Sequence, residues 1–217
     1  MAHSKDLGHM RTTYTQGVLS PEDVGSDPYH FFTQWFKAAE DDSNIREANA
    51  MSVCTLAPNG FPQARIVLLK EYSSEGFVFY TNLESKKGKS IAQHKQVSLS
   101  FFWPSLERQV HIDGNAFLID EATATAYFQS RPKGSQLGAW ASYQSAVVEN
   151  RAELTDRLAA LEIQYAKDEV LPKPPFWGGF RVVPQRFEFW QGRPNRLHDR
   201  VELLLTNDQW KAQRLSP

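Results

Sequence analysis

Cations next to hydroxyl groups form the clearest chemical signal in this sequence. Arg65 and Lys70 bracket the apolar run RIVLLK, and Arg131 and Ser135 lie within SRPKGSQ. Arginine forks and lysine ammonium groups beside hydroxyls are a common way for a protein to hold a phosphate dianion. The chain therefore contains candidate residues for at least one phosphate site.

A second group of cations is less specific. Lys86 and Lys87 stand at the start of a short predicted helix, where a solvated face is the simpler interpretation of the run SKKGK. The strand around Arg65 gives a stronger signal, because the apolar centre Ile66–Leu69 predicts burial on both faces and a charge beside it needs a partner. In an ideal strand Arg65 and Lys70 point to opposite faces, so spacing alone does not join them in one site.

The run NRLHDR near the C-terminus places cations at alternating positions. In an extended strand Arg196, His198 and Arg200 share one face, near Trp190 across a hairpin, and Asp199 takes the other face. The residues leave two interpretations open. They form either a functional surface of cations and an imidazole, or an exposed edge strand whose charges prevent pairing with other chains. Asp199 has no predicted role.

The elements that must position these residues follow from periodicity and turn signals. Asp27 as a cap, Pro28 in the first turn and an apolar stripe predict a packing helix within residues 26–42. Runs at 50–57, 64–72 and 77–82 predict three strands in a meander, and further strands are predicted at 96–103, 108–119, 178–191 and 196–205. Helices are predicted at 83–94, 120–132 and 150–167, with Ser85 and Asp120 at the first two starts.

Strands mostly follow strands, which favours a mainly β or α+β fold, with an antiparallel sheet closed into a barrel and flanking helices. The length of 217 residues favours one domain, which we expect to span 27–217. Residues 10–26 are expected to form a flexible N-terminal segment. Residues 1–9 resemble the remainder of an expression tag, because a second Met follows a Gly-His pair.

Composition and motif searches exclude several classes of function. A net charge of -1 without a basic run disfavours nucleic-acid binding, and no apolar run approaches a membrane span of ~18 residues. Cys54 is the single cysteine and is interpreted as a small buried hydrophobe in a reducing, cytoplasmic setting. The GKS at Gly88–Ser90 lacks the earlier glycine of a phosphate loop, where Leu83 stands, and dinucleotide, serine-hydrolase and metal motifs are missing.

Seven segments together resemble one enzyme family. ARIVLLK, GFVFYTNLESKKG, ERQVHIDG, YFQSRPKGSQLGAW, QSAVV, FWGGFRV and FEFWQGRPNRLHDR follow the order and near-spacing of the pyridoxine/pyridoxamine 5'-phosphate oxidase family. The resemblance covers nearly the whole chain from about Asp27. It implies an FMN-binding split β-barrel, antiparallel and Greek-key-like, that works as a homodimer with each flavin held between subunits.

The resemblance also implies an activity. The family oxidises pyridoxine 5'-phosphate and pyridoxamine 5'-phosphate to pyridoxal 5'-phosphate by hydride transfer to FMN, the last step of pyridoxal phosphate (vitamin B6) biosynthesis or salvage. Dioxygen reoxidises the flavin and gives hydrogen peroxide, and the amine substrate releases ammonia. The chain would thus be an oxidoreductase acting on CH-NH2 donors with oxygen as acceptor, without a metal.

Residue roles follow from the same resemblance. The implied flavin contacts are Arg65, Ile66, Val67, Leu68, Leu69, Lys70, Tyr80, Thr81, Lys86, Lys87, Gln109, Gln144, Ser145, Trp190 and Arg200. The implied substrate-phosphate residues are Lys70, Tyr127, Arg131 and Ser135, and Arg196 and His198 are implied as catalytic residues over the substrate ring. Lys86 departs from the family, which usually has arginine there, and so loses the bidentate fork.

Two other functions compete with the oxidase. A split-barrel protein could hold flavin or pyridoxal phosphate without turnover, but such a carrier has no evident need for a ring-facing arginine and histidine. A related flavin reductase would act on an unphosphorylated substrate and would not need the substrate-phosphate residues.

Overall fold

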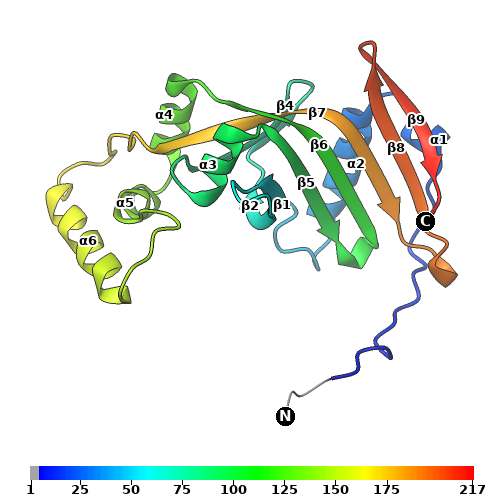
Figure 1. Ribbon diagram of the computed structural model, residues 1–217, viewed down its shortest axis with the longest axis horizontal. Coiled ribbons are helices and arrows are strands. Elements are labelled where there is room, and N and C mark those ends of the chain that lie inside the picture. Colours follow the sequence, from blue (N-terminus) through cyan, green and yellow to red (C-terminus); the bar gives the residue numbers. More distant parts are fainter. Residues whose placement is uncertain (1–4) are drawn as a thin grey trace. The chain divides into compact units, whose positions relative to one another are not determined.

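The computed structural model describes residues 5–217, which form an antiparallel sheet with helices (Figure 1). The strands are β1 (Ala50–Leu56), β2 (Pro62–Leu68), β3 (Glu71–Ser73), β4 (Gly76–Asn82), β5 (Gln96–Trp103), β6 (Arg108–Leu118), β7 (Trp177–Gln191), β8 (Asp199–Thr206) and β9 (Gln209–Leu215). The helices are α1 (Pro21–Val24), α2 (Pro28–Asp41), α3 (Lys86–Gln93), α4 (Glu121–Ser130), α5 (Lys133–Ala141) and α6 (Arg151–Gln164), with short 3-10 turns at Pro104–Leu106 and Pro194–Arg196. The first four residues, part of the predicted tag 1–9, lie outside the described residues.

The strand order is β2-β1-β5-β6-β7-β4-β3, and β8 pairs with β7 and β9. The pairs β1–β2, β1–β5, β3–β4, β4–β7, β7–β8 and β8–β9 are antiparallel. The predicted meander is confirmed in part. β1 pairs with β2, and the predicted strand 64–72 divides into β2 and β3, of which β3 pairs with β4. Strand β4 also pairs with β7, far along the chain, which was not expected. Pairing between distant segments is set by the whole sheet and leaves no local signal.

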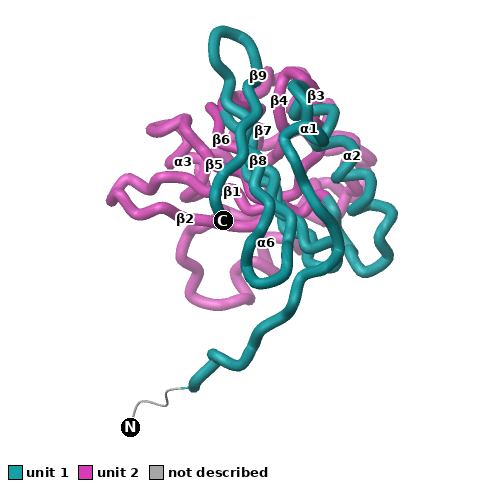
Figure 2. The backbone as a smooth tube through the Cα atoms, turned by 90° about the vertical axis from the view of Figure 1, so that its right-hand side faces the viewer, with its two compact units in different colours: residues 1–48, 101–111, 186–217 teal, residues 49–100, 112–185 magenta. Residues whose placement is uncertain are grey.

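Two compact units divide the chain (Figure 2). The first unit comprises residues 1–48, 101–111 and 186–217, and the second comprises residues 49–100 and 112–185. Strands β5, β6 and β7 each contribute to both units, so the division falls within strands. The expected single domain 27–217 stays a prediction.

In the first unit, α2 packs its apolar stripe against aromatic residues. Asp27 accepts hydrogen bonds from the amides of Tyr29 and His30 and so caps the helix, as predicted. Phe31 meets Phe189 edge-on with ring centroids 4.9 Å apart, and Phe32 meets Phe101 with centroids 5.2 Å apart. Such edge-to-face pairs add to the burial of α2.

In the second unit, a separate cluster of buried side chains lies under α4, α5 and the start of β7. Its members are Phe128, Leu137, Leu171 and Trp177, with the partly buried Tyr80, Tyr127, Ala139, Trp140, Leu158, Leu161 and Tyr165 packed around them. The side chain of Asp120 caps α4 and that of Ser85 caps α3, both as predicted. This cluster supports one side of the pocket described below.

Among the helices and strands, α1, α5 and β9 were not expected from the sequence. Helix α5 follows α4 after Pro132, and β9 follows β8 through a two-residue turn in which Asn207 and Asp208 have φ of 50° and 60°. Positive φ at both central positions defines the hairpin turn that Asn and Asp favour. Among residues 5–217, no helix combines the length and apolar composition that a membrane crossing requires.

Candidate functional site

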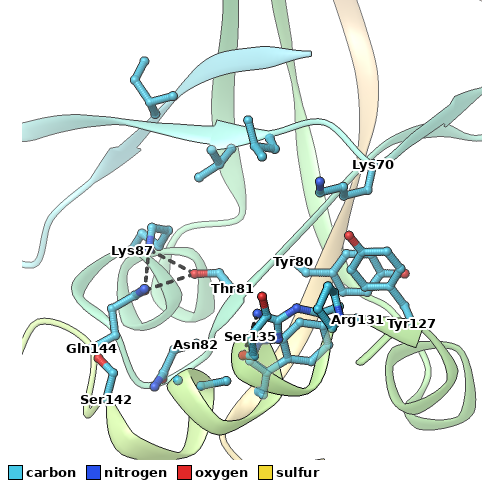
Figure 3. A pocket seen from close by; sticks show the side chains of 17 residues that line it. Lys70, Tyr80, Thr81, Asn82, Lys87, Tyr127, Arg131, Ser135, Ser142 and Gln144 are labelled. Atoms are coloured by element: carbon cyan, nitrogen blue, oxygen red, sulfur yellow. Dashed lines mark hydrogen bonds between the residues drawn. The ribbon is translucent and has the colours of Figure 1, made fainter. Parts of the chain in front are cut away.

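A pocket of about 670 Å³ in the second unit holds the strongest concentration of predicted site residues (Figure 3). Its lining comes from the edge of β2, from β4, α3, α4 and α5, and from the start of β7. The lining residues are Ile66, Val67, Leu68, Lys70, Tyr80, Thr81, Asn82, Lys87, Tyr127, Arg131, Pro132, Ser135, Gly138, Ala139, Ser142, Gln144 and Trp177.

One end of the pocket is built around Lys87, in the first turn of α3. Its Nζ atom donates hydrogen bonds to Oγ1 of Thr81 over 3.0 Å and to Oε1 of Gln144 over 2.6 Å (Figure 3). Burial, with a further contribution from the charge of Arg65, lowers the pKa of Lys87 to about 8. The neutral partners do not balance the ammonium charge, so this end favours an anionic ligand.

The backbone of α3 approaches the chain closely at this end. A Cβ atom at Gly88 would lie 2.1 Å from the carbonyl oxygen of Leu83, so only glycine fits there. The Ser85 hydroxyl accepts a hydrogen bond from the Gly88 amide and satisfies one of the free amides of the first helical turn. Glycine and the cap together fix how α3 presents Lys87 to the pocket.

The other end of the pocket gathers Lys70, Tyr127, Arg131 and Ser135 (Figure 3). The Nη2 atom of Arg131 donates to the carbonyl oxygen of Ser135 over 3.0 Å. Its Nη1 atom is buried and has no hydrogen-bond partner in residues 5–217. Burial lowers the pKa of Arg131, although the group stays a cation at neutral pH. An unpaired guanidinium nitrogen beside an exposed lysine again favours an anion.

Aromatic rings form the wall next to Arg131. The rings of Tyr80 and Tyr127 stack with centroids 4.0 Å apart, and Trp177 stacks on Tyr80 at 5.2 Å. Strand β7 makes room for this stack with glycine, because a Cβ atom at Gly179 would lie 2.6 Å from the Tyr80 ring. The wall is flat and apolar, which suits a planar ligand.

Helix α5 supplies lining residues that the sequence reasoning missed. Gly138, Ala139 and the C-cap residue Ser142 line the pocket at helical spacing with the predicted Ser135, and all four residues are small. This spacing of small residues after Pro132 is a signal that could have predicted both the helix and its pocket face. Small side chains allow a ligand to approach the helix backbone.

The predicted burial of β2 on both faces is wrong. Ile66 is 68% exposed, because β2 stands at the end of the strand order and pairs only with β1 among the described strands. Leu69 is buried after the end of β2, where its amide donates to the carbonyl oxygen of Asn49 over 2.8 Å, and it does not line the pocket. Ile66, Val67 and Leu68 do line it, as does Lys70.

Three further predicted flavin contacts of the second unit lie outside the lining. Arg65 donates to Oγ1 of Thr55 over 2.6 Å and to the Gln63 carbonyl oxygen over 2.8 Å, and burial lowers its pKa. Arg65 therefore has the specific partners that its position requires. Lys86 and Ser145 line a smaller neighbouring pocket of about 200 Å³, where the Lys86 amide donates to the Ser145 hydroxyl.

The remaining predicted residues belong to the first unit and do not line the pocket within residues 5–217: Gln109, Trp190, Arg196, His198 and Arg200. Gln109 lies on β6, where its Oε1 atom is 3.2 Å from Nε2 of His111. Arg200 pairs with Trp190 in the register of β7 and β8, as predicted for the hairpin.

The predicted strand across NRLHDR is wrong for its first half. Asn195 and Arg196 have φ of 58° and 63°, and β8 begins only at Asp199. Pro194 lacks the amide needed for strand pairing, and two consecutive left-handed residues turn the chain away from an extended course. Arg196 and His198 therefore lie in a turn, and alternation along a strand does not set their directions.

Contacts with neighbouring residues determine which nitrogen of the His198 ring carries the proton when the ring is neutral. Its Nδ1 atom accepts a hydrogen bond of 3.1 Å from the Arg193 amide, so a neutral ring carries its proton on Nε2. The ring packs against Trp190 and Tyr14, with centroid distances of 4.6 Å and 5.7 Å, and these two rings also contact each other. His198 can thus donate a hydrogen bond from Nε2 in a fixed direction.

An ion-pair network holds Arg200. Its Nε atom donates to Oε1 of Glu188 over 2.7 Å, and its Nη1 atom donates to the Ser216 carbonyl oxygen over 2.8 Å. Glu188 is buried and also pairs with Arg186. Burial by itself would raise the pKa of Glu188, but hydrogen bonds and charges of Arg200 and Arg186 outweigh it and lower that pKa. The hydrogen bond to Glu188 raises the pKa of Arg200.

Asp199, which had no predicted role, binds the N-terminal segment. Its Oδ2 atom accepts from the Leu19 amide over 3.1 Å, and its Oδ1 atom pairs with Arg214 over 2.8 Å. The buried Glu107 acts in the same way, since its Oε2 atom accepts from the amides of Thr15 and Gln16 over 2.7 Å and 2.9 Å. The flexibility predicted for residues 10–26 stays a prediction.

In residues 5–217, no three His, Cys, Asp or Glu side chains gather as metal ligands would. The groups of the pocket that could bind a ligand are its cations, hydroxyls and aromatic rings. Two cationic ends joined by an apolar wall could hold two anionic groups or one long ligand with a phosphate at its end.

Comparisons with known proteins agree with this chemistry. Residues 38–165 match the family described as pyridoxamine 5'-phosphate oxidase, and residues 177–217 match the pyridoxine 5'-phosphate oxidase C-terminal dimerisation region. The chain is 51% identical over 211 residues to a pyridoxine/pyridoxamine 5'-phosphate oxidase from Synechocystis sp., covering 97% of this chain and 98% of that protein. An oxidase of the same name from Christiangramia forsetii is 46% identical and covers 98% of this chain and 99% of its own length.

Solved structures support the fold. PhzG from Burkholderia lata, in complex with tetrahydrophenazine-1-carboxylic acid, is similar with a TM-score of 0.84 and 27% identity over 92% of this chain and 98% of that one. An FMN-binding protein from Nostoc punctiforme shares the fold with a TM-score of 0.70 and 16% identity, covering 89% of this chain and 100% of that one. The predicted antiparallel split barrel with flanking helices is confirmed, and the chain belongs to the pyridoxine/pyridoxamine 5'-phosphate oxidase family.

Proposed function

We propose that the chain is an FMN-dependent oxidase that converts pyridoxine 5'-phosphate and pyridoxamine 5'-phosphate to pyridoxal 5'-phosphate, with dioxygen as final acceptor and hydrogen peroxide as by-product. The observation that carries this proposal is the presence of two cationic ends in one pocket, around Lys87 and around Arg131. A flavin phosphate and a substrate phosphate each need one such end. The names of the relatives, which match nearly the full chain, give independent support.

The residues present fit FMN. Lys87 is a partly buried cation that lacks a balancing carboxylate among its hydrogen-bond partners, and Thr81 and Gln144 offer polar groups beside it. The edge strand β2 lines the same pocket with Ile66, Val67 and Leu68. These residues offer backbone hydrogen-bonding groups and apolar side chains to the cofactor. When bound, FMN supplies the acceptor for two electrons and passes them to dioxygen.

The end around Arg131 fits the phosphate of the substrate. Lys70 and Arg131 provide positive charge, and the hydroxyl groups of Tyr127 and Ser135 are donors for phosphate oxygens. These contacts are remote from the carbon that is oxidised. They supply binding energy that holds the substrate in the orientation that the reaction requires.

We further propose that the catalytic site is completed by the partner subunit of a homodimer. Arg196 and His198 are not among the pocket lining within residues 5–217, nor are Gln109, Trp190 and Arg200, although each is expected near the flavin or the substrate ring. Four of these five residues belong to the segment that matches a dimerisation region. A partner chain would bring them to the open side of the pocket, with FMN at the interface.

In that arrangement Arg196 and His198 would act on the substrate ring. Arg196 would fix the pose of the ring and stabilise the charge that develops as hydride leaves. The Nε2 proton of His198 makes this residue a hydrogen-bond donor to a substrate oxygen in its neutral state. It would not remove a proton through Nε2 in that state, because the atom is already protonated.

The two competing functions receive less support. A carrier without turnover gives no reason for the fixed donor at His198. A reductase for an unphosphorylated substrate gives no reason for gathering Lys70, Tyr127, Arg131 and Ser135 at one end of the pocket. The reducing environment inferred from the single Cys54 agrees with a cytoplasmic location, which we include in the proposal.

Aerobic turnover tests the proposed function. The protein is purified with FMN, its visible spectrum is recorded, and pyridoxine 5'-phosphate is added in air while pyridoxal 5'-phosphate and peroxide are measured. We expect a bound flavin and equal amounts of the two products, with far weaker activity on pyridoxine. Failure to bind flavin, or equal rates with pyridoxine, would overturn the proposal.

A further inference from the structure

One indole ring contacts two side chains of the substrate end of the pocket, Tyr127 and Arg131, and also Tyr80 of the adjoining aromatic wall. Trp177 stacks nearly parallel to Tyr80 and Tyr127, with interplanar angles of 7° and 17°, and centroid distances of 5.2 Å and 6.1 Å. The guanidinium carbon of Arg131 lies 5.1 Å from the centroid of the same ring. No other ring in residues 5–217 is recorded in contact with all three of these residues.

The guanidinium of Arg131 has few other contacts that fix its direction. Its one recorded hydrogen bond runs from Nη2 to the Ser135 carbonyl oxygen, and Nη1 has no partner among the described residues. An arginine side chain has many accessible rotamers, so a free one would have to be ordered by the ligand. Contact with the face of Trp177, and with the more distant ring of Phe128 at 5.5 Å, restricts the rotamers of Arg131 before a ligand binds.

The backbone of Trp177 is itself held from several sides. Its amide donates to the Pro174 carbonyl oxygen over 3.0 Å, and its carbonyl oxygen accepts from Nζ of Lys173 over 2.6 Å. The Lys173 side chain is only 3% exposed and pairs with Glu121 over 3.1 Å. Trp177 also pairs with Asn82 in the register of β7 and β4. The indole therefore stands on a fixed part of the chain, which is what a positioning group requires.

We infer that Trp177 is a positioning residue for the substrate phosphate, acting through Arg131 and Tyr127. This inference rests on the proposed function, because it takes the ligand at this end of the pocket to be a phosphate. Trp177 preorganises the two donors and so sets the affinity for the phosphorylated substrate. Turnover depends on it little, since the oxidised carbon is remote from this contact.

The test compares Trp177→Leu and Trp177→Phe with the matched control Trp140→Phe. Trp140 belongs to the same cluster, but its recorded contacts are with Phe176 and the Pro172 carbonyl oxygen. We expect Trp177→Leu to raise KM for pyridoxine 5'-phosphate about tenfold, with kcat changed less than about twofold. A loss of this size corresponds to one cation–π contact together with the cost of ordering the Arg131 side chain on binding. Trp177→Phe keeps an aromatic face and should recover most of the affinity, and Trp140→Phe should leave KM unchanged.

A binding measurement gives a readout that does not depend on activity. The Kd of pyridoxal 5'-phosphate and the Kd of pyridoxal are measured for the FMN-loaded variants. Trp177→Leu should weaken the phosphorylated ligand about tenfold and pyridoxal less than about twofold. Equal weakening of both ligands, or a loss confined to kcat, would overturn the inference. If Trp177→Leu does not fold, the same criteria apply to Trp177→Phe, with an expected change of about threefold.

A double mutant separates the inference from the proposed function. If Trp177 acts through Arg131, Trp177→Phe should change the Kd of pyridoxal 5'-phosphate much less on an Arg131→Ala background than alone. An equal change on both backgrounds would contradict action through Arg131. If Arg131→Ala itself leaves this Kd unchanged, the proposed phosphate site fails and the inference fails with it. If Arg131→Ala weakens binding and neither Trp177 variant does, only the inference fails.

Discussion

The Nζ atom of Lys87 donates a hydrogen bond of 2.6 Å to Oε1 of Gln144 at one end of the pocket. This neutral acceptor orients the ammonium group without neutralising it. Burial is therefore the main influence on the pKa of Lys87, which it lowers to about 8. A dianionic phosphate bound beside it would restore the preference for the charged form, which links cofactor binding to pH.

We predict that FMN affinity falls as pH rises through about 8. Below the pKa of the free protein Lys87 is charged before and after binding, whereas above it binding must take up a proton. The affinity should fall by up to about tenfold for each pH unit above that point. Quenching of FMN fluorescence, titrated between about pH 6.5 and about pH 9, measures this slope.

The control variants for this prediction are Lys87→Met and Lys86→Met. Lys87→Met should bind FMN weakly with a flat pH profile in this range. Lys86 is exposed and lines the smaller pocket, so Lys86→Met should keep the slope. A wild-type affinity independent of pH up to about pH 9 would show that Lys87 does not contact the phosphate.

Arg131 and Arg196 should differ in the kinetic constant that they affect. Arg131→Ala removes a charge-assisted contact to a remote phosphate, worth about 1.5–3 kcal/mol, and should raise KM by about tenfold or more with little change in kcat. Arg196→Ala removes stabilisation at the reacting ring and should lower kcat by about a hundredfold. Steady-state kinetics with pyridoxine 5'-phosphate measures both. Equal effects on KM and kcat in the two variants would contradict this division.

The shared site of the proposed homodimer can be tested by mixing these variants. If Arg131 and Arg196 of one site come from different subunits, an Arg131→Ala/Arg196→Ala heterodimer contains one intact site and one doubly altered site. Random reassortment by partial denaturation and refolding should then restore about a quarter of the wild-type sites. The assay uses pyridoxine 5'-phosphate well below KM, where both variants are impaired. A mixture no more active than the average of the two variants would instead place both residues of a site in one subunit.

Glu188 should contribute to stability in a pH-dependent way. It is buried between Arg186 and Arg200. Glu188→Ala leaves Arg200 without its carboxylate partner, whereas Arg186 keeps Glu202, and should lower the free energy of unfolding by about 3 kcal/mol. Its lowered pKa means that the contribution is present above the unfolded value of 4.5 and is lost as pH falls through the folded value. Urea unfolding at several pH values measures this. Glu188→Gln should flatten the acid side of the profile, and an unchanged profile would refute the coupling.

Glu107 should protect two amides of the N-terminal segment from exchange. Its carboxylate accepts from the amides of Thr15 and Gln16, and Glu107→Ala removes both acceptors. Hydrogen exchange at these two amides should become at least about tenfold faster. The control is Asp208→Asn in the turn between β8 and β9, which should leave their exchange unchanged. Unchanged exchange in Glu107→Ala would show that other contacts hold the segment.

The sequence predicted those features that depend on local chemistry. Asp27, Ser85 and Asp120 were identified as helix starts because a capping side chain bonds amides two or three residues away. The resemblance implies four residues for a substrate phosphate, and all four line the pocket, although their role stays a prediction. Spacing alone could not join Lys70 and Arg131, since their proximity depends on how distant segments pack.

One failure concerns a feature that the whole sheet decides, and two concern local turns. The exposed Ile66 follows from the edge position of β2, which no local pattern encodes. The left-handed Arg196 could not be expected from alternation, although the preceding Pro194 and Asn195 were turn signals. The dipeptide Asn207–Asp208 was a similar signal for the hairpin that leads to β9.

A single turnover without oxygen tests the central claim most directly. The FMN-loaded protein is mixed anaerobically with pyridoxine 5'-phosphate, and flavin absorbance and pyridoxal 5'-phosphate are followed together. We expect loss of the visible flavin absorbance with one pyridoxal 5'-phosphate formed per flavin, a weak response to pyridoxine, and recovery of the absorbance in air. A flavin that stays oxidised in the presence of pyridoxine 5'-phosphate and pyridoxamine 5'-phosphate would contradict this claim.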